Sequence, residues 1–369
     1  MVDRWISKRT EHFDSSGIRR VFDLAAKIEN PINLSIGQPD FDVSDRTKEA
    51  AYRAIREGKN GYTLTQGIPP LKTKLQKKVD DEFNHDDREL FISSGTSGGL
   101  TVAMLSLIDP GDEVILFDPY FLVYPSIVRL AGGVPIIIDT HPDFRIDIND
   151  VQEAITDKTK AIIFNNPSNP TGVVATEEEV RGLANLAKEK GIVLISDEIY
   201  SDFCFDAPFV SPAKYNDQTI VVTGLSKSHA MTGWRVGFVH GPKALIDAML
   251  RIQQYTFVCA PQPLQWAAVE GLDEDLTDHI HAYQKKRDLI YNGLSDLLEI
   301  ARPCGAFYIY PKAPGGSGIA FVEKAIKNKI LTIPGTIFSK HDSHFRISYA
   351  ASNETLEQGI ESLRKLIKS

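Results

Sequence analysis

The chain has 369 residues, of which 42% are hydrophobic and 24% charged, and its formal net charge is −8. This length is too great for one ordinary core and predicts two domains in a protein of ordinary globular composition. Because the net charge is negative and no polybasic block occurs, neither nucleic acid nor an anionic membrane is expected as a partner. The first residues contain no long apolar core and no apolar run approaches roughly 18 residues, so we expect neither a signal peptide nor a spanning helix.

The cysteines and histidines show no pattern typical of a disulfide framework or a metal site. The three cysteines, Cys204, Cys259 and Cys304, are far apart in the sequence. They predict no set of disulfides and no CxxC metal motif, and a reducing cytoplasm is the expected compartment. The nine histidines include no HExxH motif, and His279 and His281 would point in different directions on a helix. We therefore expect no protein-bound metal.

The middle of the chain alternates between predicted strands and helices. The stretch 177–190 has apolar positions at helical spacing, and Gly191 follows it, as glycine often follows the end of a helix. Short apolar runs without polar alternation suit strands that are buried on both faces. These runs are E-V-I-L-F at 113–117, V-P-I-I-I at 134–138, A-I-I-F at 161–164, I-V-L-I at 192–195 and T-I-V-V at 219–222. The alternation predicts a mostly parallel sheet with helices on both faces.

The last third of the chain has a pattern typical of a smaller α+β domain. A long polar helix is expected at 277–298 and a closing helix near 354–367. The strand candidates are A-F-Y-I-Y at 306–310, I-L-T-I at 330–333 and F-R-I-S at 345–348. We expect the segment before about Pro39 to pack with this domain. The predicted domains are therefore a large one at 39–275 and a small one made of 1–38 and 276–369.

The first motif that suggests a chemical function is S-G-T-S-G-G at 94–99, which follows the apolar run L-F-I-S and begins a predicted helix. Backbone N–H groups at a helix start, together with the Thr96 and Ser97 hydroxyls, form a cradle for phosphate. The same residues also fit G-x-S-x-G, the nucleophile elbow of α/β-hydrolases, with Ser97 as nucleophile and His341 or His344 as possible partners. That hydrolase interpretation leaves the motifs that follow without a role.

Three further motifs lie at or near predicted strand ends, where ligands bind in open α/β sheets. Phe121, in D-P-Y-F-L-V-Y-P, can stack on a planar ring or serve as a core aromatic. Two prolines and a glycine in N-P-S-N-P-T-G at 166–172 fix a loop that either aims the Asn169 amide at a ligand or is a plain turn. Asp197 follows G-I-V-L-I-S, and Tyr200 comes three residues later. A carboxylate there can keep a pyridine nitrogen protonated, although a helix cap and a half-buried tyrosine give the same pattern.

The segment at 223–237, T-G-L-S-K-S-H-A-M-T-G-W-R-V-G, places Lys227 eight residues before Arg235. A lysine that reacts with an aldehyde needs a partly desolvated site in which it can lose its proton. An arginine can hold a phosphate by a bidentate contact. One cofactor carries both an aldehyde and a phosphate, namely pyridoxal 5'-phosphate (PLP). Arg346, in the apolar strand pattern H-F-R-I-S-Y, either is paired structurally or binds a carboxylate.

Together these motifs make the chain resemble the fold-type-I PLP-dependent aminotransferases of classes I and II. The resemblance extends from S-I-G-Q-P-D-F-D at 35–42 to F-R-I-S-Y-A at 345–350, and is greatest to the short prokaryotic aspartate/aromatic amino-acid aminotransferases. It implies a large domain with a mostly parallel sheet flanked by helices, plus a smaller α+β domain. It also implies ping-pong transamination between an L-amino acid, with the aspartate or aromatic class favoured, and a 2-oxo acid such as 2-oxoglutarate.

The resemblance assigns a role to each matching residue. It makes Lys227 the lysine that holds PLP and transfers protons, and Asp197 the partner of the pyridine nitrogen, while Tyr200 and Asn169 would contact the ring's 3'-oxygen. The residues implied to contact the rest of the cofactor are Gly95, Thr96, Ser97, Phe121, Ser226, Arg235 and Tyr62. Tyr62 would reach the phosphate of a neighbouring subunit, which implies a homodimer with shared active sites. The residues implied to contact the substrate are Arg346, as clamp for the α-carboxylate, Gly37, Asn169 and Phe307.

Two positions depart from the family's pattern, and other functions share the motifs. Gly224 stands where some members carry a hydroxyl that contacts phosphate, so Ser226 is the nearest substitute. Ser97 stands where some aspartate-preferring members have a lysine, which weakens an aspartate-only interpretation.

A PLP-dependent β-lyase or a γ-eliminating synthase would use the same cofactor contacts. A regulator that keeps the fold as an effector-binding domain is a further alternative, although no DNA-binding module is appended.

Overall fold

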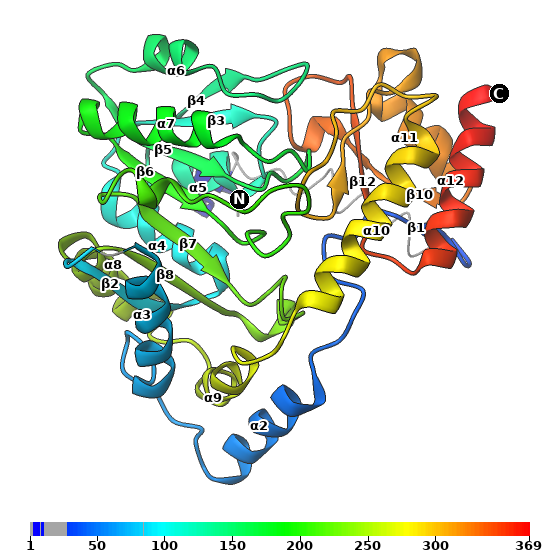
Figure 1. The fold of residues 1–369 in the computed structure, drawn as a ribbon. Coiled ribbons are helices and arrows are strands. Elements are labelled where there is room, and N and C mark those ends of the chain that lie inside the picture. Colours follow the sequence, from blue (N-terminus) through cyan, green and yellow to red (C-terminus); the bar gives the residue numbers. More distant parts are fainter. Residues whose placement is uncertain (1–2, 8, 11–27, 84) are drawn as a thin grey trace.

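The computed structural model describes residues 3–7, 9, 10, 28–83 and 85–369 of the chain. A seven-stranded sheet dominates it, with the strand order β2-β8-β7-β6-β5-β3-β4 (Figure 1). The strands of this sheet are β2 (Arg88–Ser94), β3 (Glu113–Asp118), β4 (Val134–Asp139), β5 (Thr159–Asn165), β6 (Val193–Asp197), β7 (Ile220–Gly224) and β8 (Val236–Pro242). β8 pairs antiparallel with β2 and β7, whereas the other neighbours pair in parallel. Every strand except β8 therefore ends at the same edge of the sheet.

Helices cover both faces of this sheet. They are α3 (Pro69–Phe83), α4 (Gly95–Leu107), α5 (Val123–Leu130), α6 (Ile148–Ala154), α7 (Glu177–Lys190), α8 (Lys243–Thr256) and α9 (Gln262–Gly271). Helix α2 (Asp45–Arg56) packs against α9, away from the sheet (Figure 1). Alternate side chains of β5 pack on opposite faces: Ala161 and Ile163 join the core under α4, α5 and α8, and Ile162 and Phe164 join the core under α6 and α7. Burial on both faces explains why the strands are apolar without alternation.

The remaining strands and helices gather on one side of this sheet, where the blue β1 lies among the yellow to red elements of Figure 1. They are β1 (Ile32–Asn33), β9 (Tyr308–Ile309), β10 (Ile330–Leu331), β11 (Ile333–Pro334), β12 (Phe345–Ser348), α10 (Thr277–Leu294), α11 (Gly318–Lys327) and α12 (Asn353–Lys368). We call them the C-terminal region, and we call the sheet with α2–α9 the central region. The short 3-10 helices are η1 (Asp3–Trp5), η3 (Pro212–Lys214), η4 (Thr232–Trp234), η5 (Pro314–Gly316) and η6 (Gly335–Ile337).

The C-terminal region has its own sheets and core. β1 pairs in parallel with β10, and β12 pairs antiparallel with β11 and β9. Leu34, next to β1, belongs to the same buried cluster as side chains of α10, α11 and α12. The described part of the segment before Pro39 thus packs with the C-terminal region, while residues 1, 2, 8 and 11–27 lie outside the described residues. The domain boundaries at 39–275, and at 1–38 with 276–369, stay a prediction.

Most predicted elements agree with the structure, and the differences have local causes. Helix α7 has the predicted bounds, with a capping box at Thr176 and Glu179 and left-handed Gly191 at its end. The predicted helix 277–298 ends at Leu294, because the chain turns there and carries Leu298 into the core. The predicted strand 330–333 is two strands, since its halves pair with different partners, β1 and β12. No helix of the described residues is long and apolar enough to cross a membrane.

Candidate active site

A cavity of about 240 Å³ lies where the carboxyl edge of the central sheet meets the C-terminal region. Its volume is far above the roughly 10–15 Å³ that one water molecule requires. The predicted site residues that line it are Gly37, Thr96, Ser97, Phe121, Asn169, Asp197, Tyr200, Ser226, Lys227, Arg235 and Arg346. They lie at or after the ends of β1, β2, β3, β5, β6 and β7, directly before β8, and in β12. The parallel arrangement therefore brings distant motifs to one place.

Lys227 lies in the connection between β7 and β8, and its amine points into the cavity. Its Nζ donates a hydrogen bond to the Gly37 carbonyl at 2.6 Å, and the rings of Tyr200 and Phe307 are each 5.8 Å away. Burial lowers the pKa of the Lys227 amine to about 8, and the Arg346 guanidinium acts in the same direction. Roughly a tenth of this amine is therefore neutral at pH 7, far more than for an unperturbed lysine, and the neutral form is the one that a nucleophile or a base requires.

Asp197, the last residue of β6, supplies a buried carboxylate. The Tyr124 hydroxyl donates a hydrogen bond to Oδ2 at 2.8 Å, and the backbone N–H of Ile199 donates one to Oδ1 at 3.3 Å. Burial raises the pKa of Asp197 to about 6, although these two hydrogen bonds hold it down. The carboxyl is thus mostly ionised at neutral pH in a dry environment, where a cationic ring nitrogen would be a strong partner.

Tyr200 and Asn169 extend the polar wall on either side of Asp197. The Tyr200 hydroxyl is 2.9 Å from the Tyr308 hydroxyl. The backbone N–H of Asn169 donates to Asn165 Oδ1 at 2.9 Å, and the Asn165 side chain donates in turn to the Asp197 carbonyl at 3.0 Å. The predicted rigid loop is therefore attached to the end of β6, which fixes the position of its amide.

Arg346, in β12, is buried and carries no countercharge among the described residues. Its Nη1 donates to Asn169 Oδ1 and its Nη2 to the Ser35 carbonyl, both at 2.9 Å, while its Nε is buried with no hydrogen-bond partner. The guanidinium lies 4.4 Å from the Tyr308 ring and 4.7 Å from the Phe338 ring. Burial lowers the pKa of Arg346, and a buried charge with neutral partners and N–H donors to spare suits a ligand carboxylate.

Arg235 and the start of α4 form the opposite end of the cavity. Arg235 Nη1 donates to the Thr232 carbonyl at 2.7 Å, and its Nη2 lies 3.5 Å from the Ser94 carbonyl. Gly95 has a φ of +67°, and a Cβ there would lie 2.5 Å from Arg235 Nη2. Glycine is therefore required for the arginine to approach the helix start, although Gly95 does not itself line the cavity. Backbone N–H groups and a guanidinium at one point form an anion site.

The departure at Gly224 has a steric reason. A Cβ at this position would lie 2.7 Å from the Cα of Gly237, on the neighbouring strand. No side chain, with or without a hydroxyl, fits between β7 and β8 there. Ser226 instead lines the cavity two residues later.

Besides Gly95, two predicted residues do not line the cavity. Phe307 is fully buried behind it, with its ring edge-to-face against Tyr200 at 5.3 Å. Its neighbour Tyr308 lines the cavity instead, a shift of one residue that reverses the direction of the side chain along a strand. Tyr62 is 85% exposed and does not line the cavity, so its contact with a neighbouring subunit stays a prediction.

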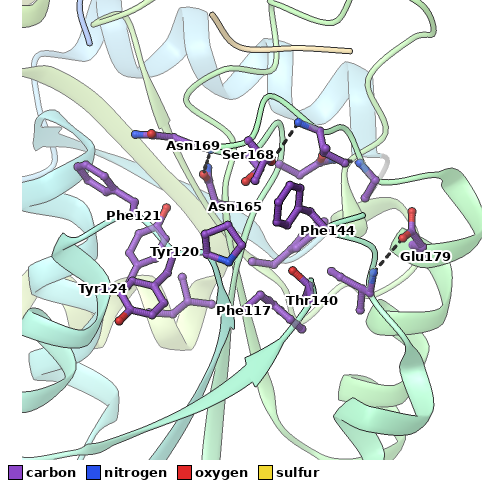
Figure 2. A pocket seen from close by; sticks show the side chains of 18 residues that line it. Phe117, Tyr120, Phe121, Tyr124, Thr140, Phe144, Asn165, Ser168, Asn169 and Glu179 are labelled. Atoms are coloured by element: carbon purple, nitrogen blue, oxygen red, sulfur yellow. Dashed lines mark hydrogen bonds between the residues drawn. The ribbon is translucent and has the colours of Figure 1, made fainter. Parts of the chain in front are cut away.

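A smaller pocket of about 50 Å³ adjoins the cavity, and Figure 2 shows its lining. The two share Phe121, Tyr124, Asn165 and Asn169. The rings of Phe121 and Tyr124 meet edge to face at 5.6 Å. This packing holds Phe121 at the boundary between the two spaces, where one of its faces is available to a planar ligand.

The motifs did not reveal several residues of the cavity, of which Tyr124, Asn165 and Tyr308 make the most specific contacts. Each lies one to four residues from a residue that was predicted: Tyr124 follows Phe121, Asn165 precedes Asn169, and Tyr308 follows Phe307. Proximity to a motif was therefore an available signal. Which neighbour faces the cavity depends on the register of the strand or helix. The remaining residues that were not predicted are Ser35, Leu122, Ile199, Thr232 and Ile333.

The hydrolase interpretation of Ser97 fails on geometry. Ser97 lines the cavity, but no histidine is among the residues that line it. His341 pairs instead with Asp139, and His344 hydrogen-bonds Ser343. Because a serine nucleophile needs a base within hydrogen-bond reach, the elbow motif here does not form a triad.

Comparison with known proteins supports the same conclusion as the geometry. The family model "Aminotransferase class I and II" matches residues 29–363. A probable aspartate aminotransferase from Methanocaldococcus jannaschii is 39% identical, over 98% of this chain and 100% of its own length. Aromatic-amino-acid aminotransferase 2 from Thermococcus litoralis is 33% identical, over 98% of each chain.

Solved structures agree with the family match. An aspartate aminotransferase from Thermus thermophilus superposes with a TM-score of 0.93 at 34% identity, covering 98% of this chain and 99% of that one. The fold and the resemblance predicted from the motifs are thereby confirmed, and the chain belongs to the class I and II aminotransferase family.

Proposed function

We propose that the cavity binds PLP and that this aminotransferase exchanges an amino group between an aspartate-class or aromatic L-amino acid and a 2-oxo acid such as 2-oxoglutarate. One observation carries the proposal: a desolvated lysine, a buried carboxylate and a buried unpaired arginine face a single cavity. Class I and II aminotransferases are PLP-dependent, and the relatives include aspartate, aspartate/prephenate, aromatic and N-acetyl-LL-diaminopimelate aminotransferases.

The donor set fits PLP group by group. The cradle of Gly95 and Arg235, which a Cβ would fill, suits a phosphate dianion. Asp197 suits a protonated pyridine nitrogen, because its carboxylate is buried and oriented by Tyr124. The residues that would hold the cofactor are Thr96, Ser97, Phe121, Asn169, Asp197, Tyr200, Ser226, Lys227 and Arg235. When bound, PLP supplies an aldehyde that reacts with amines and a ring that withdraws electrons.

The chain's own residues then perform binding, orientation and proton transfer. Arg346 holds the substrate α-carboxylate through paired N–H donors, and Asn169 keeps the guanidinium in place. Lys227 Nζ, neutral near its pKa of about 8, removes the proton from the substrate Cα and later returns a proton. The Tyr200 hydroxyl donates a hydrogen bond to the 3'-oxygen of the cofactor ring. Tyr200 and Tyr308 are buried, so this wall of the cavity excludes water.

A homodimer is part of this proposal. Tyr62, Leu64, Tyr255 and Phe257 are large apolar side chains that are at least partly exposed. Gln253, in α8, donates to the Thr65 carbonyl, which connects the segment of Tyr62 to the helix that precedes Phe257. Exposed apolar side chains near one another suit an interface between subunits. A particle mass in light scattering that is twice the mass of one chain would support the dimer. A monomer that is fully active would contradict it. A cytoplasmic location, in accord with three free cysteines, is also proposed.

The test of the proposed function is a panel of amino donors assayed with 2-oxoglutarate. We expect a yellow protein that borohydride bleaches, and a change in cofactor colour in half-reactions with aspartate or with phenylalanine and tyrosine. Release of ammonia and a 2-oxo acid without an acceptor would instead indicate a lyase. A colourless protein whose Ser97 is labelled by a fluorophosphonate would refute the proposal.

A further inference from the structure

A second cluster of reactive side chains lies away from the cavity, at the end of β4. It consists of Asp139, His141 and His341, whose donor atoms all lie within 4.8 Å of one another. Asp139 is the last residue of β4, and His341 belongs to the segment that precedes β12. None of the three lines the candidate active site. The cluster therefore joins the central region to the C-terminal region at a point that the proposed chemistry does not use.

We propose that this cluster, the Asp–His–His cluster, binds one divalent transition-metal ion such as Zn²⁺ or Co²⁺. Two imidazole nitrogens and a carboxylate oxygen are the ligands these ions prefer, whereas Mg²⁺ and Ca²⁺ favour oxygen ligands alone. Three protein ligands leave a fourth position for water in tetrahedral coordination.

The ring nitrogens are directed at the same carboxylate. His141 Nδ1 is 2.7 Å from Asp139 Oδ1, and His341 Nε2 is 2.8 Å from Asp139 Oδ2. Metal bonds of about 2.0–2.2 Å in a tetrahedron separate neighbouring donors by about 3.3–3.6 Å. The two histidine–carboxylate separations are shorter than this, and all three donor atoms lie within 4.8 Å of one another, so small side-chain rotations are sufficient to admit an ion.

One ligand is held rigidly and two are open to solvent. The side chain of His141 is 14% exposed, against 54% for Asp139 and 47% for His341. The backbone N–H of His141 also donates to Asp139 Oδ1 at 3.0 Å, and the Phe144 ring packs against the imidazole at 5.1 Å. An ion can thus enter from the solvent side, and its water ligand can face solvent.

The surroundings favour a cation. Asp139 and His141 line an open groove whose other charged residues are mostly acidic, including Asp143, Asp147 and Glu178. Arg145, which is the one lysine or arginine among the described residues that line the groove, pairs with Glu179. Such a groove raises the local concentration of cations. This proposal departs from the expectation of no metal, because His341 lies far from Asp139 in sequence and no ligand spacing reveals the set.

The experiment uses untagged protein with its cofactor bound, titrated with Co²⁺ alone by absorption spectroscopy and with Zn²⁺ alone by calorimetry. We expect one equivalent of each metal to bind, with a Co²⁺ spectrum of four-coordinate type. His341→Ala removes an exposed ligand and should weaken binding by roughly tenfold or more. His281→Ala, at an exposed histidine on α10, is the matched control and should bind as the parent does.

A second readout is thermal stability. Because a ligand that binds only the folded state stabilises it, excess Zn²⁺ should raise the Tm of the parent and of His281→Ala but not of His341→Ala. Any Co²⁺ that binds the cofactor would also bind in His341→Ala. The signal of this variant is therefore subtracted from that of the parent protein. No binding in the parent, or equal binding in His341→Ala, would show that the cluster is only a hydrogen-bonded Asp–His–His group. Transamination should be unchanged in His341→Ala, so failure here is separate from failure of the proposed function.

Discussion

The central and C-terminal regions contribute different halves of the candidate site. The central region supplies groups that suit a cofactor: Lys227, Asp197 and Arg235 lie at the ends of long, paired strands. The C-terminal region supplies Arg346 and Tyr308, which suit a substrate, from strands of two to four residues. Because the two halves of the site lie in different regions, substitutions can alter one side at a time. The predictions below use substitutions on each side to test that separation.

The largest effect is expected at Lys227. Lys227→Ala removes both the amine that reacts with the aldehyde and the base, so turnover should fall by at least about 10⁴-fold, while PLP still binds without a covalent bond. Turnover assays and peptide mapping after borohydride reduction measure this, with the pyridoxyl group expected on Lys227 in the parent. Lys243→Ala, at an exposed lysine paired with Asp247, is the control. Labelling of any other lysine would overturn the assignment.

A smaller loss is expected from Asp197→Asn, also in the central region. The amide cannot keep a pyridine nitrogen protonated, so single-turnover rates should fall by roughly 10²–10⁴-fold with the cofactor retained. Stopped-flow absorbance of the half-reaction is the measurement. Asp217→Asn changes a half-exposed carboxylate and should leave the rate unchanged. A near-normal rate in Asp197→Asn would refute the role.

The comparison between regions is tested most directly by a pair of arginine variants. Arg346→Lys keeps the charge but loses the two-pronged contact, so kcat/KM should fall by roughly 10–150-fold for every donor, with PLP affinity nearly unchanged. Arg235→Lys should do the opposite and release PLP faster. PLP dissociation and half-reaction rates are measured on both. If Arg346→Lys loses PLP but reacts normally once saturated, the two regions do not divide the work as proposed.

The smallest effect is expected at Tyr124, which acts through Asp197. Tyr124→Phe removes a hydrogen bond to the carboxylate, so half-reaction rates at neutral pH should fall by roughly tenfold. That hydrogen bond lowers the pKa of Asp197 against the effect of burial. Its removal should therefore raise this pKa above about 6 in the free protein and move the acid limb of the kcat/KM–pH profile to higher pH. A lower rate with an unshifted profile would indicate a merely structural role.

The sequence predicted the central region better than the C-terminal one for a physical reason. The runs at 113–117 and 161–164 are buried on both faces, so each is a continuous apolar run that indicates a strand without reference to its partners. The run at 330–333 divides between β10 and β11 because its partners lie far away in the chain. No local pattern contains that information.

The candidate site shows the same contrast. Lys227, Asp197 and Arg346 occur within motifs whose residue types have few other uses in an apolar strand or glycine-rich turn. Tyr308 and Phe307 are adjacent aromatics, and only the register of β9 against β12 decides which one faces the cavity. The Asp–His–His cluster was beyond prediction, because its members meet only through the fold.

The reversed direction of β8 has a consequence for movement within the enzyme. Because β7 ends and β8 begins at the same edge, one short connection carries both Lys227 and Arg235. Their separation is therefore internal to the central region. Arg346 has no such link to the lysine, since it belongs to β12. If the C-terminal region rotated on the central region as substrate entered, the Lys227 amine would keep its position relative to Arg235, while Arg346 would move toward it. Such a rotation would change the position of Arg346 without moving Lys227 and Arg235 relative to each other.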